Sequence, residues 1–451
     1  MRVVARWAVA GLIAAVLIVP SAALAAAPSA TLVSDIHPDG GSGPQDLTAV
    51  GEVVFFSATD GTHGRELWAT DGTPEGTRLV RDIRPGDAGS TPRSLTRVGG
   101  LLYFSADDGS HGRELWVSDG TRPGTRLVRD LAPGAKGSGE LTIKDLGGSA
   151  YFSRRYEDLW RTDGTSASTR LVHAFKGIDL AGSAVMGSKL YFGADGALWK
   201  TNGDATGTKR ISGRWLDVGG LTRFGRHLYL WGMFYGPDGP SCGPGETGCL
   251  VPPYLWWSDG TWAGTKQLGT IIAFDDFAVL GKAIYFDGQA PGSGVRLYTS
   301  DGSKAGTGKV VPRVRPLPEM QKRAGSIWAT SSSSSLPWRD ELWVSDATAI
   351  GTTLVKGGSG DWFTSDDRLE SVGLDGRLWF AAGPGEIVGD EWRLTDHELW
   401  VSDGTSEGTA QAADINPTGS SFPRDFARLG GNLLFGANDG EHGRELWLVT
   451  P

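Results

Sequence analysis

Three nearly identical loops hold the side chains best suited to chemistry. Each reads Asp-Gly-x-His-Gly-Arg-Glu, and together they contain three of the seven histidines of the chain. Imidazole is the commonest protein ligand for metals, and beside a guanidinium it can bind an anion. The alternative is that Asp-Gly turns recur for structural reasons alone. The candidate ligand-binding residues are His63, Arg65, His111, Arg113, His442 and Arg444.

Catalytic signatures are absent from the rest of the sequence. It has no Gly-x-Ser-x-Gly elbow, no His-Glu-x-x-His, no Cys-x-x-Cys and no Walker loop. Carboxylates are plentiful, but the sequence alone does not bring two of them to the separation that glycoside hydrolysis needs. No catalytic residue, no metal ligand and no cofactor is therefore predicted.

Composition restricts the elements that must position these loops. The 451 residues include 68 Gly and 23 Pro, too many for long helices, in which each glycine costs about 1 kcal/mol relative to alanine. The 18 Trp, 16 Phe and 9 Tyr exclude a disordered chain. Many short strands joined by tight turns remain. The formal charge of −9 disfavours nucleic acid as a partner, because phosphate binding depends on Lys and Arg.

A sequence motif built around Glu-Leu-Trp recurs along the chain at spacings of 39 to 57 residues. Its clearest copies are 66–77 and 114–125, where Asp-Gly-Thr-x-x-Gly-Thr follows the tryptophan. We number nine copies as repeats one to nine by their Leu-Trp or Leu-Tyr pairs, which are 67–68, 115–116, 159–160, 198–199, 255–256, 297–298, 342–343, 399–400 and 446–447.

Each clear repeat contains four strand signals. In repeat two they are 94–98, 101–106, 114–118 and 125–131, each short and bounded by Gly, Asp or Pro. Four strands in about 47 residues are typical of a β-propeller blade. We predict an all-β fold, a single closed propeller of nine four-stranded blades, with eight as the alternative count.

The two ends of the chain favour closure of a ring. Residues 31–38 match the fourth strand of a repeat, and the chain stops after the third strand of repeat nine. The N-terminal strand is therefore expected to complete the last blade, which removes the exposed edges of an open array. The repeated tryptophans are expected to pack between neighbouring blades. Each Asp-Gly-Thr is interpreted as a turn; calcium is the alternative there, although the dense Asp spacing of a calcium loop is missing.

The phrase Glu-Leu-Trp-x-Ser/Thr-Asp-Gly-Thr-x-x-Gly-Thr resembles the signature of bacterial ELWxxDGT-repeat proteins. The resemblance extends from Thr31 to Trp447; it is specific in repeats one, two and eight, and weaker at 202–204 and 346–348. It implies an exported, propeller-like protein and no particular activity.

The beginning of the chain predicts export. Residues 1–25 combine two arginines, an apolar run and a small-x-small ending, as in a secretory signal peptide, and 26–451 form the propeller. No later stretch is long and apolar enough to span a membrane. The mature protein is expected in the periplasm or outside the cell, as a monomer. In that compartment, Cys242 and Cys249 favour a disulfide over free thiols.

Length variation indicates where a partner binds. The connection between the second and third strands is expanded at 232–253, 331–339 and 383–397, whereas the Asp-Gly-Thr turns keep a nearly constant length. Variable loops on a rigid scaffold tend to carry binding residues. We therefore predict a non-catalytic binding or cell-surface interaction module for a glycan, an envelope component or a protein. The alternative is a lyase or hydrolase acting on polysaccharide at the central channel.

Overall fold

The computed structural model describes residues 28–134, 136–211, 216–234, 252–310, 321–323, 326–333, 336–345, 352–356, 370–388, 391–394 and 396–451. In these ranges the chain is all-β and contains no helix, so none is found that is long and apolar enough to cross a membrane. The predicted signal segment and both cysteines lie outside the described residues. Of the three expanded connections, residues 235–251, 334–335, 389–390 and 395 also lie outside the described residues.

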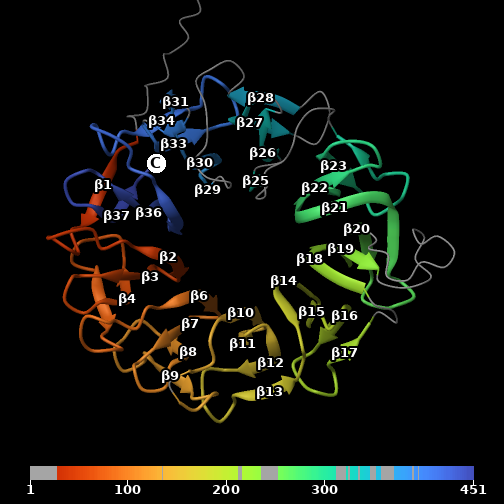
Figure 1. The fold of residues 1–451 in the computed structure, drawn as a ribbon, viewed down its shortest axis with the longest axis horizontal. Helices are drawn as coiled ribbons and strands as arrows, with labels where there is room; N and C mark the ends of the chain where they lie inside the picture. The colour runs from red at the N-terminus through yellow and green to blue at the C-terminus, as the bar shows by residue number, and fades with distance from the viewer. Residues whose placement is uncertain are drawn as a thin grey trace, which may run out of the picture.

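Repeats one to four each form a four-stranded antiparallel sheet, and the sheets follow one another around a ring (Figure 1). Repeat one comprises β2 (Gln45–Val50), β3 (Val53–Thr59), β4 (Arg65–Thr70) and β5 (Arg78–Arg81). Repeat two comprises β6 (Arg93–Val98), β7 (Leu101–Asp107), β8 (Arg113–Ser118) and β9 (Arg126–Arg129). Repeat three comprises β10 (Leu141–Leu146), β11 (Ser149–Arg154), β12 (Glu157–Thr162) and β13 (Arg170–His173). Repeat four comprises β14 (Ile178–Met186), β15 (Lys189–Ala194), β16 (Ala197–Thr201) and β17 (Lys209–Arg210).

Repeats five and six differ from the expectation of separate sheets, because they share one long strand and form a single seven-stranded sheet. The shared strand, β21 (Lys266–Leu280), pairs first with β20 (Tyr254–Ser258) and then with β22 (Ala283–Gln289). Nine of its fifteen residues are apolar, and it lacks the Pro-containing connection found between β5 and β6, so no proline ends the strand between the two repeats. The other strands are β18 (Leu216–Phe224), β19 (His227–Phe234), β20 (Tyr254–Ser258), β22 (Ala283–Gln289), β23 (Arg296–Ser300) and β24 (Gly308–Lys309).

The remaining repeats return to four-stranded sheets. Repeat seven comprises β25 (Gln321–Arg323), β26 (Ser326–Ser333), β27 (Leu336–Ser345) and β28 (Thr352–Lys356). Repeat eight comprises β29 (Ser371–Leu374), β30 (Arg377–Ala382), β33 (Glu398–Ser402) and β34 (Ala410–Ala413), with the hairpin β31 (Gly385–Val388) and β32 (Glu391–Leu394) between β30 and β33. Repeat nine comprises β35 (Arg424–Leu429), β36 (Asn432–Asn438) and β37 (Arg444–Val449), and its fourth strand is β1 (Ala30–Ser34) from the beginning of the chain.

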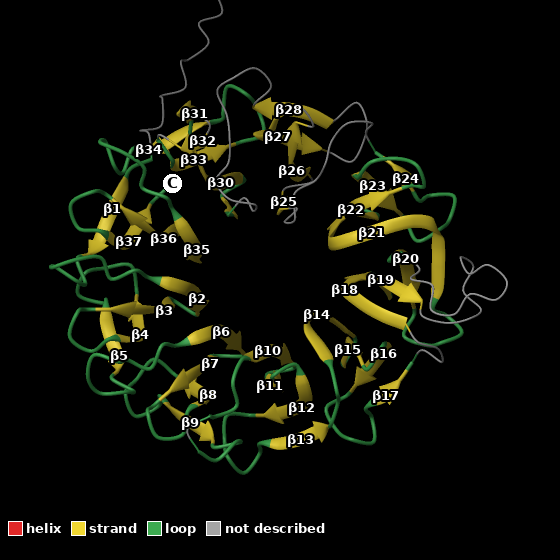
Figure 2. Cartoon of the chain, in the orientation of Figure 1, coloured by secondary structure: helices red, strands yellow, loops and turns green. Residues whose placement is uncertain are grey.

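The first strand of every repeat lies on the inside of the ring (Figure 2). These innermost strands contact one another in sequence, from β2 through β6, β10, β14, β18, β21, β25, β29 and β35, and β35 contacts β2. The third strands run from the connection after the second strand to the Asp-Gly-Thr turn. These two connections therefore lie at opposite ends of each sheet, which we call the loop face and the turn face.

Aromatic side chains pack between neighbouring repeats, as predicted. Trp68 is 9% exposed and belongs to a cluster with Leu429 and Leu434 of repeat nine. Trp116 in turn packs with Phe55 and Leu67 of repeat one. Each tryptophan therefore fills the space between its own sheet and the preceding one, where a large ring removes the most apolar surface from water.

The Asp-Gly-Thr motifs form turns, also as predicted. In repeat two the main-chain N–H and the hydroxyl of Thr121 donate to Asp119 Oδ1 at 2.8 and 2.7 Å. Gly120 between them has φ of +88°, and a Cβ at this position would lie 3.3 Å from Phe55 of the preceding repeat. Glycine is favoured here both by its left-handed backbone and by the close approach of an aromatic ring.

Candidate functional site

The three Asp-Gly-x-His-Gly-Arg loops connect the second and third strands of repeats one, two and nine, on the loop face. In repeat one, Asp60 Oδ1 accepts the main-chain N–H groups of Thr62 and His63, both at 2.9 Å. Asp60 Oδ2 lies 2.7 Å from His63 Nδ1. The corresponding distances for Asp108 with His111 and for Asp439 with His442 are 2.7 and 2.6 Å. The same aspartate therefore shapes the loop and orients the imidazole in all three repeats.

The aspartate favours the protonated form of the histidine, and the imidazole is exposed. The hydrogen bond that the His63 ring donates to Asp60 raises the pKa of His63. Partial burial opposes ionisation of Asp60, but hydrogen bonds from His63 and Thr62 lower its pKa to about 2. The side chains of His63, His111 and His442 are 41%, 43% and 38% exposed. Because Nδ1 faces the carboxylate, Nε2 is the nitrogen available to a ligand.

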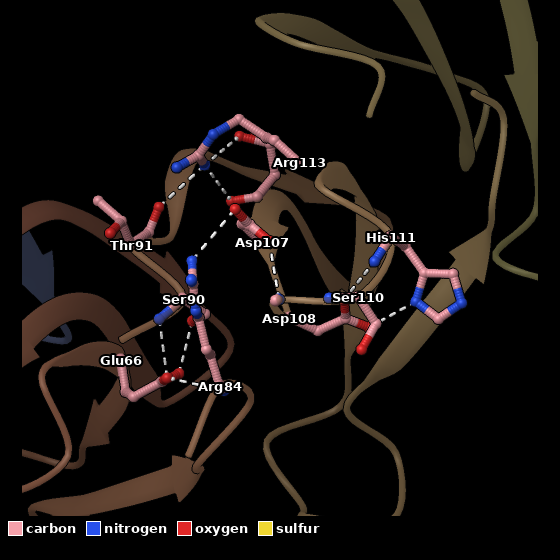
Figure 3. Close-up of polar contacts among 11 residues, drawn as sticks. Glu66, Arg84, Ser90, Thr91, Asp107, Asp108, Ser110, His111 and Arg113 are labelled. Atoms are coloured by element: carbon pink, nitrogen blue, oxygen red, sulfur yellow. Dashed lines mark hydrogen bonds and ion pairs between the residues drawn. The ribbon is translucent and has the colours of Figure 1, made fainter. Parts of the chain in front are cut away.

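The arginines of the same loops point elsewhere. Arg113 Nη1 donates to the carbonyl oxygens of Thr91 at 2.9 Å and Ser105 at 3.2 Å. Figure 3 shows its guanidinium reaching Thr91 on one side of the loop while the His111 ring lies on the other side. Burial lowers the pKa of Arg113, and these carbonyls compensate for that burial. Arg65 donates in the same way to the carbonyl oxygens of Gly43 and Ser57. Arg444 donates to those of Phe422 and Gly436.

The predicted residues are thus brought together in part. The three loops lie on consecutive sheets, since β2 contacts both β6 and β35. Within each loop, however, the histidine faces solvent and the arginine binds the segment that leads into the innermost strand. The arrangement offers one exposed imidazole per sheet, repeated three times, and no histidine–arginine pair inside a loop.

Sequence reasoning missed the role of the glutamate that ends each loop. Glu66 is fully buried, and its carboxylate accepts the main-chain N–H groups of Ile83, Arg84 and Ser90 at 3.1, 3.0 and 2.8 Å. The Ser90 hydroxyl donates to it as well, at 2.5 Å (Figure 3). These donors lie in the connection to the next sheet. In three other repeats, a glutamate at the same position also accepts main-chain N–H groups from the connection that follows. We call these four residues the carboxylate anchors: Glu66, Glu114, Glu398 and Glu445.

A signal for the anchors was present in the sequence. A glutamate in the middle of an otherwise buried Arg-Glu-Leu-Trp strand has to be paired with donors, because an uncompensated buried carboxylate is very costly. Burial raises the pKa of Glu66 despite its hydrogen bonds. The partners themselves, however, come from a connection that the spacing of the motif does not identify.

A second group of carboxylates lies where the innermost strands begin on the loop face. Asp46 N donates to Asp425 Oδ1 at 3.0 Å, and Asp425 N donates to Glu370 Oε2 at 2.8 Å. Ser94 N continues this chain by donating to Asp46. Asp46, Ser94 and Asp425 all have φ between +56° and +58°, which is unusual for residues other than glycine. Desolvation by the surrounding strand ends, followed by the charge of Asp425, raises the pKa of Asp46.

Among the described residues, one group of three carboxylates could hold a metal ion. The oxygens of Asp396, Glu398 and Asp414 lie within 4.8 Å of one another. Burial, and then the charge of Asp414, raises the pKa of Asp396. Glu398 is also a carboxylate anchor, with Ile415 N and Ser421 N each at 2.9 Å. Both Glu398 oxygens therefore already accept hydrogen bonds from main-chain N–H groups.

Comparisons with known proteins identify no family. No protein family matches the chain, and no curated protein is similar to it. Among solved structures, the computationally designed Ika8 protein is 11% identical, with a TM-score of 0.44, over 78% of this chain and 96% of that one. A puromycin hydrolase is 14% identical, with a TM-score of 0.40, over 90% of this chain and 60% of that one. Oligopeptidase B from Leishmania major is 12% identical, with a TM-score of 0.43, over 79% of this chain and 55% of that one. Likenesses this distant carry no argument about activity.

Proposed function

We propose that the chain is an exported, monomeric, non-catalytic binding module built on a closed propeller of nine repeats. Its loop face would meet a glycan, an envelope component or a protein. Three observations support closure: β1 pairs with β37, the innermost strands contact one another from β2 round to β35, and Glu445 binds the segment after β1. A closed ring completes the last sheet with β1, leaves only short sheet edges and holds the loops rigidly.

The observation that carries the binding function is the threefold repetition of an exposed imidazole. His63, His111 and His442 have the same partner geometry on three consecutive sheets of one face. The Asx turn itself uses the main-chain N–H of this residue, which any residue other than proline provides, so the turn does not require an imidazole. A row of equivalent sites can bind a partner with several equivalent groups, and each weak contact then adds to avidity.

A triple variant tests this function. His63→Ala, His111→Ala and His442→Ala are combined, and the purified protein is compared with the wild type on glycan arrays and in pull-downs from envelope fractions. The matched control places three substitutions on the turn face at the exposed residues Glu75, Arg122 and Glu407. Binding that is lost in the histidine variant and kept in the control supports the proposal. Binding equal in both variants, or none by the wild type, contradicts it.

One observation favours the alternative, a hydrolase or lyase acting on polysaccharide at the centre of the ring. Glu370, Asp425 and Asp46 form a chain of carboxylates at the inner strand ends, and the pKa values of Glu370 and Asp46 are raised. A carboxyl group with a raised pKa can act as a general acid. Release of reducing ends from polysaccharide by the wild type, abolished by Glu370→Gln in a folded protein, would establish this activity and replace the binding module.

A further inference from the structure

A cavity of about 620 Å³ lies on the loop face between repeats four and five, away from the histidine loops. Its walls come from the start of β14, the β15–β16 turn, β16, β17 and the start of β18. The side chains that matter for recognition are Lys176, Asp179, Asp195, Trp199, Arg210 and Asp217. The volume is within the range of small-molecule sites, about 300 to 1,000 Å³.

At the cavity, repeat four lacks three features that occupy this position in repeats one and two. Its second and third strands are joined by the tight turn Asp195–Gly196 in place of an Asp-Gly-x-His-Gly-Arg loop. Ala197 stands where repeats one, two, eight and nine have an anchoring glutamate. The connection from β17 to β18 is also much shorter than residues 82–92, which Glu66 holds in repeat one.

Trp199 differs from its equivalents in the hydrogen bonding of its indole. Its indole Nε1 donates to the Ala194 carbonyl oxygen at 2.9 Å. The indole nitrogens of Trp68, Trp116, Trp160 and Trp447 are buried and have no hydrogen-bond partner in the described part of the chain.

Two aromatic side chains also support Trp199. Phe175 contacts its ring edge-on, with centroids 5.1 Å apart, and His173 contacts it at 5.2 Å. The indole is therefore a fixed, half-buried wall of the cavity, and it needs little reorganisation to accept a ligand.

The polar walls combine acceptors and donors around that ring. Asp195 Oδ1 accepts the main-chain N–H groups of Lys176 at 2.8 Å and Gly177 at 3.1 Å. Asp179 Oδ1 accepts that of Gly182 at 3.0 Å. Each carboxylate is thus held through one oxygen, and its Oδ2 accepts no hydrogen bond from the described residues.

We propose that this cavity binds a short neutral oligosaccharide. The apolar face of a sugar ring would lie on the Trp199 indole, and its hydroxyls would donate to Asp179, Asp195 and Asp217. Lys176 and Arg210 would donate to hydroxyl and ring oxygens. Three carboxylates against two cations disfavour an acidic sugar, and a single aromatic wall disfavours a wholly apolar ligand. The proposal rests on the binding function above and adds a separate site with a defined ligand class.

The test uses ligand-observed NMR and calorimetry on the mature chain with neutral and uronate-containing disaccharides and trisaccharides at millimolar concentration. Trp199→Phe keeps an aromatic ring in the core but removes the indole, and Asp217→Asn removes a charge at an exposed position. Each should weaken binding of a neutral sugar about tenfold. The matched control is Trp262→Ala, which removes an indole that is 42% exposed on the turn face, and its affinity should equal that of the wild type.

Three results would overturn the proposal. They are no binding of any neutral sugar by the wild type, unchanged affinity in both cavity variants, and binding restricted to uronates. The histidine triple variant separates this proposal from the function on which it rests. If that variant loses sugar binding while the cavity variants keep it, the ligand lies on the histidine loops; the cavity proposal then fails and the binding module stands.

Discussion

Removing one carboxylate anchor should destabilise the chain by an amount that follows from its hydrogen bonds. In Glu66→Gln, an NH₂ group that cannot accept a hydrogen bond replaces one carboxylate oxygen. Glu66 Oε1 serves Arg84 N and Ser90 N, whereas Oε2 serves Ile83 N and the Ser90 hydroxyl. Placing the NH₂ group at the Oε2 position costs less, because the Ser90 hydroxyl can rotate and accept a hydrogen bond from it. One buried N–H is still left without an acceptor, and we expect a loss of about 2 kcal/mol.

The assay is guanidinium unfolding followed by tryptophan fluorescence. Glu66→Ala removes the acceptors of three main-chain donors and should cost more, about 3 to 5 kcal/mol. Glu75→Gln is the matched control, since Glu75 is exposed in the turn of the same repeat and its loss should change stability by less than about 0.5 kcal/mol. If Glu66→Gln unfolds at the same midpoint as Glu75→Gln, the carboxylate is not holding the connection and the reasoning is wrong.

The anchor also predicts a pH dependence with a defined sign. Burial raises the pKa of Glu66, so the folded chain binds this proton more tightly than the unfolded chain does. The stabilisation linked to protonation is complete below the ordinary pKa near 4.5 and is lost as the pH rises through the folded value. Glu66→Gln has no such proton, so its stability relative to the wild type should improve as the pH rises across this window.

Glu445 provides the corresponding test of ring closure. It accepts N–H groups from Ile36, His37 and Ser42, so it joins the last strand to the first segment of the chain. In a closed and cooperative ring, Glu445→Gln should lower the unfolding midpoint as much as Glu66→Gln does. A normal midpoint, with faster hydrogen exchange confined to residues 30–43, would contradict closure as a stabilising feature.

Two further predictions concern the turn face and the histidine loops. Gly203→Ala should cost about 2 to 4 kcal/mol in unfolding free energy, because Gly203 has φ of +99° and a Cβ there would overlap the hydroxyl of the buried Tyr151. The control is Gly100→Ala, whose Cβ would have no atom within 4 Å, and it should change the unfolding free energy by less than about 0.5 kcal/mol. Asp60→Asn should return the pKa of His63 toward its ordinary value in an NMR titration, because the hydrogen bond that raises it loses its charge. An unchanged His63 titration would refute the assigned partner.

The strands and turns could be predicted because they depend on neighbours in the sequence. The expected strands 94–98, 101–106 and 114–118 are each found within one residue at either end, as β6, β7 and β8. The shared strand β21 was missed. Its two halves belong to different repeats, and only their pairing with β20 and β22 shows that the chain does not turn between them.

The candidate site was predicted less completely. His63 and Arg65 are two positions apart in one motif, and the sequence presented them as a single binding set. The structure turns them to different partners, Asp60 within the loop and the carbonyl oxygen of Gly43 in the segment before β2. The second partner lies twenty-two residues away in the chain, so spacing within the motif could not identify it.

The sequence by itself determined the repeat, the strand order within a repeat, the aromatic packing positions and the turn chemistry, because each of these depends on residues a few positions apart. Only the tertiary structure decided which donors compensate Glu66, which side of the loop His63 occupies, and that repeat four opens a cavity beside Trp199. The physical reason is that these properties arise where one sheet meets the connection to the next. A buried charge or an empty volume is set there by residues that are distant in sequence.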